Sequence, residues 1–445
     1  MAHIEPFRAY RYNPDRVELS TVATQPYDKI SPEMQERYYA ASSYNLVRII
    51  LGKRQATDNP EENTYTRAAA AFRDWRKQGI LRQDPEPSIY RYVQQFRAPG
   101  SAPVDSVQFE RHGFIALGKI EDYSAGVVFR HEQTLAKPKA DRLNLLRATR
   151  AHFGQIFMLY SDPADEVARA LAGGDPPTMK MTDEYGVLHQ VWKVSDSGII
   201  EGVRRKMQDK KLIIADGHHR YETALTYRNE RRVQEAPTTL NAPSYDTLNA
   251  PSYDFVMMTF VNMDSAGLLI LPTHRVIHGL TRFSADSFVS GAREFFSVEE
   301  ADAELSAGRA TVILKQAGQT GTALLALTRD RAFLLSRPKS PAAAFKDVSI
   351  RQQALDVVQL HKCLLEGVLG ISEQAIREQT NVTYARDAAE ATTLVRSGQA
   401  NIAFLMNPVR IEQMRDIAFA GEVMPQKSTD FYPKLLSGLT VYSLE

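Results

Sequence analysis

The sequence has a single cysteine, Cys363, among 445 residues. One cysteine excludes an internal disulfide and any zinc or iron–sulfur site that is built from cysteine ligands. The segment around it, Leu-His-Lys-Cys-Leu-Leu, has the apolar spacing of a helix. We therefore interpret Cys363 as a packed core residue rather than a reactive thiol.

An excess of charge of one sign and long apolar runs are also missing. Lys and Arg number 54 against 53 for Asp and Glu, a formal net charge of +1, which weighs against a nucleic-acid partner. The longest apolar run, at 255–261, is the size of a strand and falls short of the roughly 18 residues of a membrane span. The N-terminal residues lack the apolar stretch of a signal peptide. We expect a cytoplasmic, soluble protein with no membrane partner.

Several common site signatures are missing as well. The sequence has no G-x-x-x-x-G-K-[ST] loop, no G-x-G-x-x-G opening a helix and no G-x-S-x-G elbow. His131 and Glu132 begin like the H-E-x-x-H zinc motif, but Leu135 stands where the second histidine would be. These absences argue against an ordinary P-loop, Rossmann, α/β-hydrolase or zincin site.

Helical and strand-like segments alternate along the chain, which predicts a mixed α/β fold. We expect three regions: an N-terminal α/β region at 1–105, a core at 106–280 and a separate C-terminal α/β domain at 281–445. In the last region the pattern predicts a strand at 311–314 and one long helix at 348–369. Thr-Leu-Asn-Ala-Pro-Ser-Tyr-Asp occurs at 239–246 and again at 247–254, which indicates a tandem insertion in a surface loop.

The most informative segment is 212–221, Leu-Ile-Ile-Ala-Asp-Gly-His-His-Arg-Tyr. An apolar strand enters an Asp-Gly turn and then a helix, whose first backbone N–H groups and positive dipole end attract an anion. Gly217 lets a ligand approach the backbone, and Arg220 adds a bidentate donor. Asp216 could act as a base or a magnesium ligand, and His218 or His219 as a proton carrier.

A plainer interpretation of the same segment is a tight turn with Asp216 as the helix N-cap and with packed or solvated histidines. Two histidines and an arginine beside the turn favour function. Adjacent helix positions diverge by about 100°, so His218 and His219 do not converge on one metal ion. His218 and Glu222 are four residues apart and could share one.

Four further polar segments are candidates, each with an ordinary polar loop as its alternative. They are 131–134 (His-Glu-Gln-Thr) with Lys139 and Arg142 nearby, Thr273-His274-Arg275 at a strand end, Pro26-Tyr27-Asp28, and Lys427-Ser428-Thr429 followed by Tyr432 and Lys434.

These motifs together resemble a large bacterial family that carries an A-D-G-H-H-R signature. The resemblance spans essentially the whole chain. It rests on residues 25–28, 45–48, 131–134 with 141–142, 215–220, 272–275, 424–429 and 431–434.

More distantly, Asp216-Gly217-His218-His219-Arg220 resembles the motif of free serine kinases, which have a ParB/sulfiredoxin-like fold. The resemblance implies such a nucleotide-binding core here, with an N-terminal extension. It implies a catalytic or metal-positioning role for Asp216, with His218, His219 and Arg220 on the phosphates. The kinases also use an upstream glutamate as a base, and Glu132 is the candidate in this sequence.

Our leading hypothesis is a phosphotransferase that uses ATP or ADP, with Mg²⁺, to convert a small hydroxyl amino acid, serine first, into its phosphate ester. The alternatives are a phosphoserine phosphatase that uses the same site and a ParB-like nucleotide-binding regulator. We also consider a homodimer. The candidate residues are Asp216, Glu132, His218 and His219 for catalysis; Gly217, Arg220, His131, Thr134, Lys139, Arg142, Lys427, Ser428 and Thr429 for phosphate and nucleotide; Tyr27, Asp28, His274 and Arg275 for substrate; and Asp216 for metal.

Overall fold

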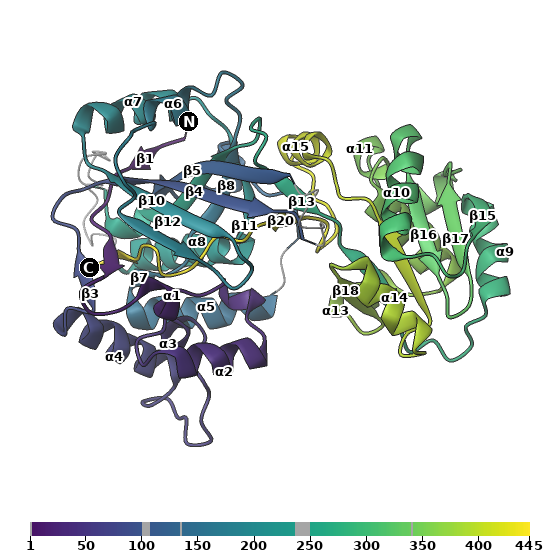
Figure 1. Cartoon of the computed structure of the whole chain (residues 1–445), viewed down its shortest axis with the longest axis horizontal. Helices are drawn as coiled ribbons and strands as arrows, with labels where there is room; N and C mark the ends of the chain where they lie inside the picture. Colours follow the sequence, from purple (N-terminus) through teal and green to yellow (C-terminus); the bar gives the residue numbers. More distant parts are fainter. Residues whose placement is uncertain (1, 100–106, 134–135, 236–249, 340) are drawn as a thin grey trace. The chain divides into compact units, whose positions relative to one another are not determined.

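The computed structural model describes residues 2–99, 107–133, 136–235, 250–339 and 341–445. These residues form two compact units, which are described separately. The first unit comprises Met1–Arg130, Thr134–Leu269 and Pro433–Glu445, and the second comprises His131–Gln133 and Ile270–Tyr432. Figure 1 labels the elements of both.

The first unit is built on a large mixed sheet. Its strands lie in the order β6 (Val128–Phe129), β11 (Leu212–Asp216), β8 (Ile156–Tyr160), β12 (Phe255–Asn262), β5 (Gln108–Lys119), β4 (Ile89–Arg97), β10 (Leu188–Val194) and β9 (Met179–Thr182), with β1 (Ile4–Glu5) paired to β5. The pairs β6–β11 and β8–β12 are parallel and the others are antiparallel. Every residue of β12 is buried, as expected for a central strand that is covered on both faces.

Helices cover this sheet (Figure 1). In that view α6 (Glu166–Ala170) and α7 (Ser197–Met207) lie at the top, while α3 (Val47–Ile50), α4 (Thr64–Lys77) and α5 (Ala136–Thr149) lie at the bottom. The carboxylate of Asp196 caps α7 by accepting from the Ile199 amide at 2.8 Å, and Ile200, Val203 and Met207 form its buried stripe. This spacing of apolar residues fixes the face that α7 turns to the sheet.

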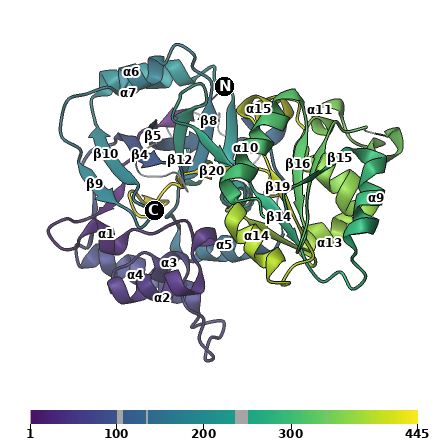
Figure 2. The ribbon, with the colours of Figure 1, turned by 45° about the vertical axis from the view of Figure 1, so that its right-hand side comes forward.

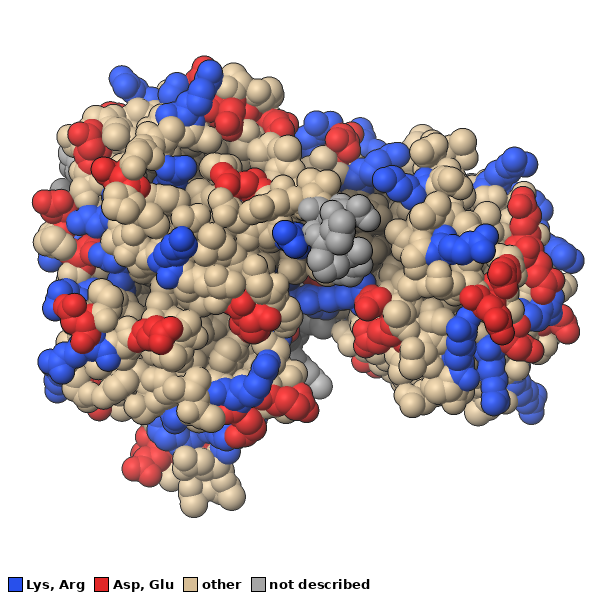
Figure 3. Space-filling model, viewed as in Figure 1, with Lys and Arg blue, Asp and Glu red and all other residues tan. Residues whose placement is uncertain are grey.

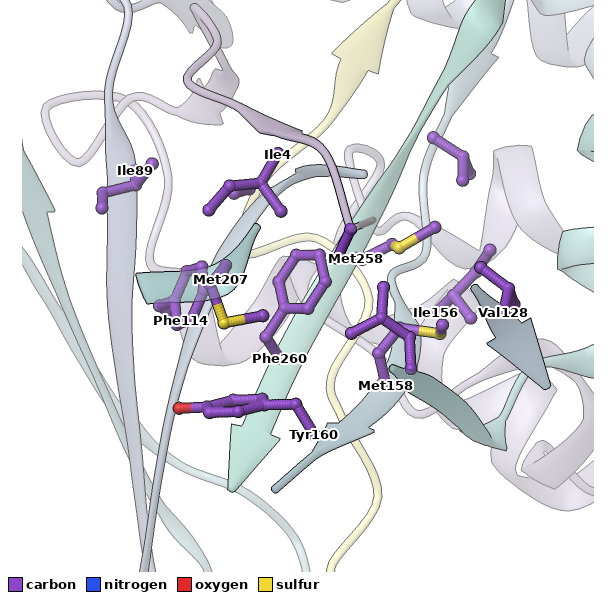
Figure 4. Close-up of a cluster of buried hydrophobic side chains, with 14 of the residues drawn as sticks. Ile4, Ile89, Phe114, Val128, Ile156, Met158, Tyr160, Met207, Met258 and Phe260 are labelled. Atoms are coloured by element: carbon purple, nitrogen blue, oxygen red, sulfur yellow. The ribbon is translucent and has the colours of Figure 1, made fainter. Parts of the chain in front are cut away.

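The main core of the first unit packs α7 residues against β5, β8 and β12 (Figure 4). Phe260 is fully buried there, and its ring stacks on Phe114 with 5.0 Å between centroids. We predict that Phe260→Ala lowers the free energy of unfolding by about 3–5 kcal/mol, because it removes buried apolar surface and leaves a cavity. Urea denaturation measures the change. Val233→Ala, at a position 79% exposed, is the control and should cost less than about 0.5 kcal/mol.

The second unit contains an antiparallel sheet in the order β15 (Ser297–Ala301), β17 (Ala332–Ser336), β16 (Ala323–Leu327), β19 (Ile402–Met406), β14 (His274–Ile277) and β18 (Val382–Ala385). Figure 2 shows α10 (Ala307–Ala317) and α14 (Ala388–Arg396) on one side of it and α9 (Ala285–Phe295) on the other. Phe288 of α9 packs on Phe404 of β19, with ring centroids 5.7 Å apart. The sheet is thus enclosed between helices.

The predicted mixed α/β class is confirmed, and Cys363 is a buried core residue as expected. The predicted regions 1–105, 106–280 and 281–445 stay predictions. Strands β4 and β5 lie on either side of the boundary predicted at residue 105, and they pair in one sheet. Of the tandem repeat, only 250–254 lies within the described residues. Among the helices that the structure describes, none is both long and apolar enough to cross a membrane.

Two sequence predictions in the second unit are wrong. The strand predicted at 311–314 lies inside α10, because Ser306 caps a helix in which Ala310 and Leu314 are buried one turn apart and Val312 is 54% exposed. The single helix predicted at 348–369 is interrupted. It consists of α11 (Ile350–Gln353), α12 (Asp356–Gln359) and the π-helix η7 (Leu360–Val368), because Leu355 is extended and buried between the first two.

Candidate functional site

The turn after β11 is built as the sequence predicts, except at the helix cap. Gly217 has φ 94° and ψ 25°, a left-handed conformation that favours glycine, and α8 (His218–Gln234) starts directly after it. A Cβ at Gly217 would lie 3.0 Å from Nε of Arg220. Gly217, not Asp216, is therefore the N-cap. Asp216 is the last residue of β11, so its carboxylate is not used as the helix cap.

Asp216 is held by two cations. Nη2 of Arg220 donates to Oδ2 of Asp216 at 2.9 Å, and Nζ of Lys434 lies 3.6 Å from Oδ1. Arg220 also donates through Nη1 to the carbonyl of Gln155, which fixes the guanidinium. The Asp216 side chain keeps 24% exposure, so a ligand can reach it.

Lys434 is positioned by the C-terminal segment of the first unit. Gln94 donates to the carbonyl of Lys434 at 3.0 Å, and the buried Arg111 donates to the carbonyl of Pro433 at 2.5 Å. The last residues of the chain continue this attachment, because β21 (Tyr442–Ser443) pairs with β7 (Ala151–His152). A lysine far from β11 in the sequence is thereby brought to its end.

The charges around Asp216 set its protonation state. Burial alone would raise the pKa of the Asp216 carboxyl, but Lys434, Arg220 and Lys29 together hold that pKa well below its ordinary value. The carboxylate is ionised at neutral pH and faces three cations. The net positive charge, next to the N-terminus of α8, suits an anionic ligand.

A small cavity of about 70 Å³ lies beside Arg220. Tyr27, Arg142 and Thr223 line it with several apolar side chains. The guanidinium of Arg142 lies 4.1 Å from the centre of the Tyr27 ring, and burial and Asp28 raise the pKa of the Tyr27 phenol to about 12. Oγ1 of Thr223 is buried and makes no hydrogen bond with any described residue. The cavity therefore offers a free hydroxyl and cationic walls to a small polar group.

Two other predicted residues of the first unit have partners within the fold. Lys139 forms an ion pair with Glu222, which also lies 3.9 Å from Arg130. Arg142 donates to the carbonyl of Ile50 at 2.6 Å and pairs with Asp141. His218 is buried and His219 is half-buried at the start of α8.

The second unit contains the other predicted residues, apart from Thr134, which lies outside the described part. Oε1 of Glu132 accepts from the Ser428 amide at 2.7 Å, and Nε2 of His131 lies 2.8 Å from Oγ1 of Thr429. Lys427 has a left-handed φ of 57°, and its carbonyl accepts from Arg275 at 3.0 Å. The structure thus brings 131–132, 275 and 427–429 together although they are far apart in the sequence.

Arg275 and His274 are buried in the second unit. Burial lowers the pKa of Arg275 to about 10, so the guanidinium stays charged, and it lies 5.2 Å from the Tyr384 ring. Nδ1 of His274 accepts from the Met406 amide at 3.1 Å, and burial lowers the pKa of His274 to about 4. These bonds to the backbone stabilise the end of β14, and a contact of either residue with substrate stays a prediction.

His274 makes the stability of the second unit depend on pH. Its folded pKa of about 4 lies below the unfolded value of about 6.5, so the unfolded chain binds more protons between these values. We predict that protonation of His274 does not affect the free energy of unfolding above pH 6.5 and lowers it by up to about 3 kcal/mol as the pH drops towards 4. In His274→Asn this loss should shrink, as followed by urea denaturation at several pH values. An equal loss in both proteins would contradict the assignment.

The described residues do not fit a metal held by the protein. Among them, no group of three His, Cys, Asp or Glu side chains could hold an ion. Both oxygens of Asp216 face cations, and Glu222 pairs with Lys139. Asp216 and the pair His218–Glu222 therefore lack the free carboxylate oxygens that Mg²⁺ needs. That Mg²⁺ binds at Asp216 stays a prediction, and it concerns the protein with a ligand bound.

Lys29 and Thr223 were not predicted from the sequence, and Lys434 was named there only beside the candidate segment 427–429, without a role of its own. Lys434 ends the segment 431–434 and Lys29 directly follows Tyr27-Asp28, so the neighbouring motifs were the available signal. No signal in the sequence pointed to Thr223, because the burial of its side chain depends on how the fold packs. On the face shown in Figure 3, basic and acidic side chains are interspersed, as the net charge of +1 leads one to expect.

The family model described as "Protein of unknown function (DUF1015)" matches residues 4–358. The match covers well over half of the chain, so the chain belongs to the DUF1015 family. A search of curated proteins gave no significant match.

Three solved structures show a weak likeness. A free serine kinase in complex with AMP has a TM-score of 0.34 and 12% identity, covering 68% of this chain and 83% of the kinase. SbnI from Staphylococcus aureus, truncated at its C-terminus, has a TM-score of 0.33 and 10% identity, covering 73% and 85%. A conserved hypothetical protein from Pyrococcus furiosus has a TM-score of 0.33 and 10% identity, covering 68% and 87%. A likeness this weak carries no argument about the function of this chain.

Proposed function

We propose that this member of the DUF1015 family is a phosphotransferase that moves a phosphoryl group from ATP or ADP to the hydroxyl of a small amino acid, free serine being the first candidate. The observation that carries the proposal is the centre at the end of β11, where Asp216 faces Arg220, Lys434 and Lys29 beside the N-terminus of α8. Phosphoryl transfer depends on such positioning and charge stabilisation.

In this proposal the nucleotide phosphates lie at the start of α8. The first backbone N–H groups of an α-helix have no partner inside the helix, and Arg220 and Lys434 add charged donors. Because Gly217 has no side chain, the guanidinium of Arg220 can lie close against the backbone at this turn. His218 and His219 lie in the first turn and are proposed to contact the same phosphates.

Asp216 is proposed to orient the acceptor hydroxyl and to take its proton. The hydroxyl oxygen forms a bond to the terminal phosphorus, the bond from that phosphorus to the bridging oxygen breaks, and the nucleotide leaves with the electron pair. The hydroxyl proton passes to Asp216 and then to solvent. A carboxylate with so low a pKa is a weak base, which suits a loose transition state in which the proton moves late.

The size of the acceptor follows from the cavity beside Arg220. Its volume of about 70 Å³ has room for one small polar group, such as the carboxylate of an amino acid. Thr223 and Arg142 provide donors there, and the neutral phenol of Tyr27 closes one wall. Asp28 is proposed to contact the same substrate. The roles predicted for residues of the second unit stay predictions. They are Glu132 as the base in place of Asp216, His131, Lys427, Ser428 and Thr429 as phosphate contacts, and His274 and Arg275 as substrate contacts.

Nucleotide binding tests the phosphate part of the proposal. We predict that Lys434→Met weakens the binding of ATP or ADP by about 10- to 100-fold, because it removes one charge-assisted contact. Isothermal titration calorimetry measures the affinity. Lys206→Met is the matched control, since Lys206 of the same unit pairs with Glu166 at 2.8 Å on the surface. Equal affinities of the wild type and Lys434→Met would contradict the proposed phosphate site.

A further inference from the structure

The second unit contains a cavity of about 470 Å³. Its walls come from residues 343–348, from α12 and the π-helix η7, from α13 (Glu373–Glu378) and from residues 423–426. Gln133, from the candidate segment 131–134, also lines it, but none of the residues to which the sequence assigns a catalytic or binding role does. Its volume lies within the range of small-molecule sites in proteins, roughly 300–1,000 Å³.

His361 on η7 is the buried polar group of this cavity. Its side chain is 6% exposed, and its Nε2 atom is fully buried without a hydrogen bond to any described residue. Burial, with Arg275 and Lys362 nearby, holds the pKa of His361 well below its ordinary value, so the ring is neutral. Buried polar atoms without a partner are rare in folded proteins, and a missing ligand is one explanation. π-Helical segments are rare in proteins and are frequently found at functional sites.

The charges around the cavity balance. Lysines and arginines at 346, 362 and 377 stand against acidic residues at 347, 366 and 373. Lys362 pairs with Glu366 at 3.0 Å, and Arg377 pairs with Glu373 at 2.8 Å. There is no surplus of positive charge for a phosphate group, in contrast to the centre at Asp216.

The remaining lining is apolar with a few amides. Val348, Val358, Ile376 and Val423 offer surfaces for a flat ring. Gln426 donates through Nε2 to the carbonyl of Arg377 at 2.9 Å, which leaves its Oε1 as an acceptor. A neutral imidazole and an amide between apolar walls are groups that recognise the polar edge of a heterocycle.

We propose that this cavity binds an uncharged heterocyclic molecule of nucleoside size, with its ring against the valine and isoleucine side chains and its polar edge on His361. The molecule occupies a second small-molecule site of the protein, independent of the phosphoryl-transfer centre. A nucleoside has the size, neutrality and hydrogen-bonding edge that the cavity requires.

Calorimetric titration of the full chain with adenosine, guanosine, cytidine and uridine, and with their monophosphates, tests the proposal. We expect at least one nucleoside to bind with a Kd below about 1 mM, and its monophosphate to bind at least about 10-fold more weakly to Lys434→Met, in which the phosphate centre is impaired. His361→Phe should weaken the nucleoside by about 10-fold or more, while His278→Phe, at a surface position of the same unit, should not.

Two variants identify the site. Val423→Trp, at a half-buried position on the wall, should abolish nucleoside binding, and it decides the question if His361→Phe does not fold. Lys434→Met should leave nucleoside binding unchanged, because Lys434 belongs to the other centre. Absence of binding by all four nucleosides, or unchanged binding in Val423→Trp, would overturn the proposal without bearing on the proposed transferase activity.

Discussion

Replacing Asp216 with asparagine is expected to lower the turnover number by about 10²- to 10⁴-fold while the chain stays folded. The amide keeps the size of the side chain but cannot accept the hydroxyl proton. It also leaves the charges of Arg220, Lys434 and Lys29 without the carboxylate that now orients them. Steady-state kinetics with serine and the preferred nucleotide measure the loss.

The acid stability of the same variant is the control that separates catalysis from folding. The folded pKa of Asp216 is depressed below its unfolded value of about 3.9. Its ionised form therefore stabilises the fold above about pH 4, and this contribution is lost as the pH falls through the folded value. Asp216→Asn should be less stable at pH 7 and should lose less on acidification. Full turnover in a folded Asp216→Asn protein would contradict the catalytic role.

Replacing Arg220 with lysine is expected to lower kcat/KM by about 10²- to 10³-fold, although the charge is kept. The guanidinium binds Asp216 and the Gln155 carbonyl at the same time and lies against Gly217, whereas an ammonium group cannot span these positions. Kinetics with varied nucleotide concentration measure the change.

Arg204→Lys is the matched control, because Arg204 pairs with Glu5 at 2.7 Å elsewhere in the first unit. It should leave kcat/KM within about two-fold of the wild type. If Arg220→Lys also stayed within that range, the guanidinium would not be part of the phosphate site.

The local parts of the fold and site could be predicted from the sequence because they depend on neighbouring residues. The apolar run 212–215 followed by Asp216-Gly217 indicates a strand, a turn and a helix, and the structure has them in that order. The alanine-rich helix α4 follows from its composition and from its cap, Asn63.

The rest depends on tertiary packing that the sequence pattern does not contain. Lys434 reaches Asp216 only because Gln94 and Arg111 hold its segment beside the first sheet. In the second unit the run 311–314 has the residues of a strand, but Ser306 and the burial of Ala310 and Leu314 select a helix. The break at Leu355 likewise follows from the burial of that side chain in an extended conformation.

The most direct test of the proposed phosphotransferase is ³¹P NMR of the purified protein with L-serine and Mg²⁺, with ATP and ADP in separate samples and O-phosphoserine alone in a third. The proposal predicts a new phosphomonoester signal that appears only when serine and a nucleotide are both present. The sample that shows the signal identifies whether ATP or ADP is the donor. Unchanged spectra in both nucleotide samples would contradict the transfer to serine. Release of phosphate from phosphoserine without nucleotide would show a phosphatase instead.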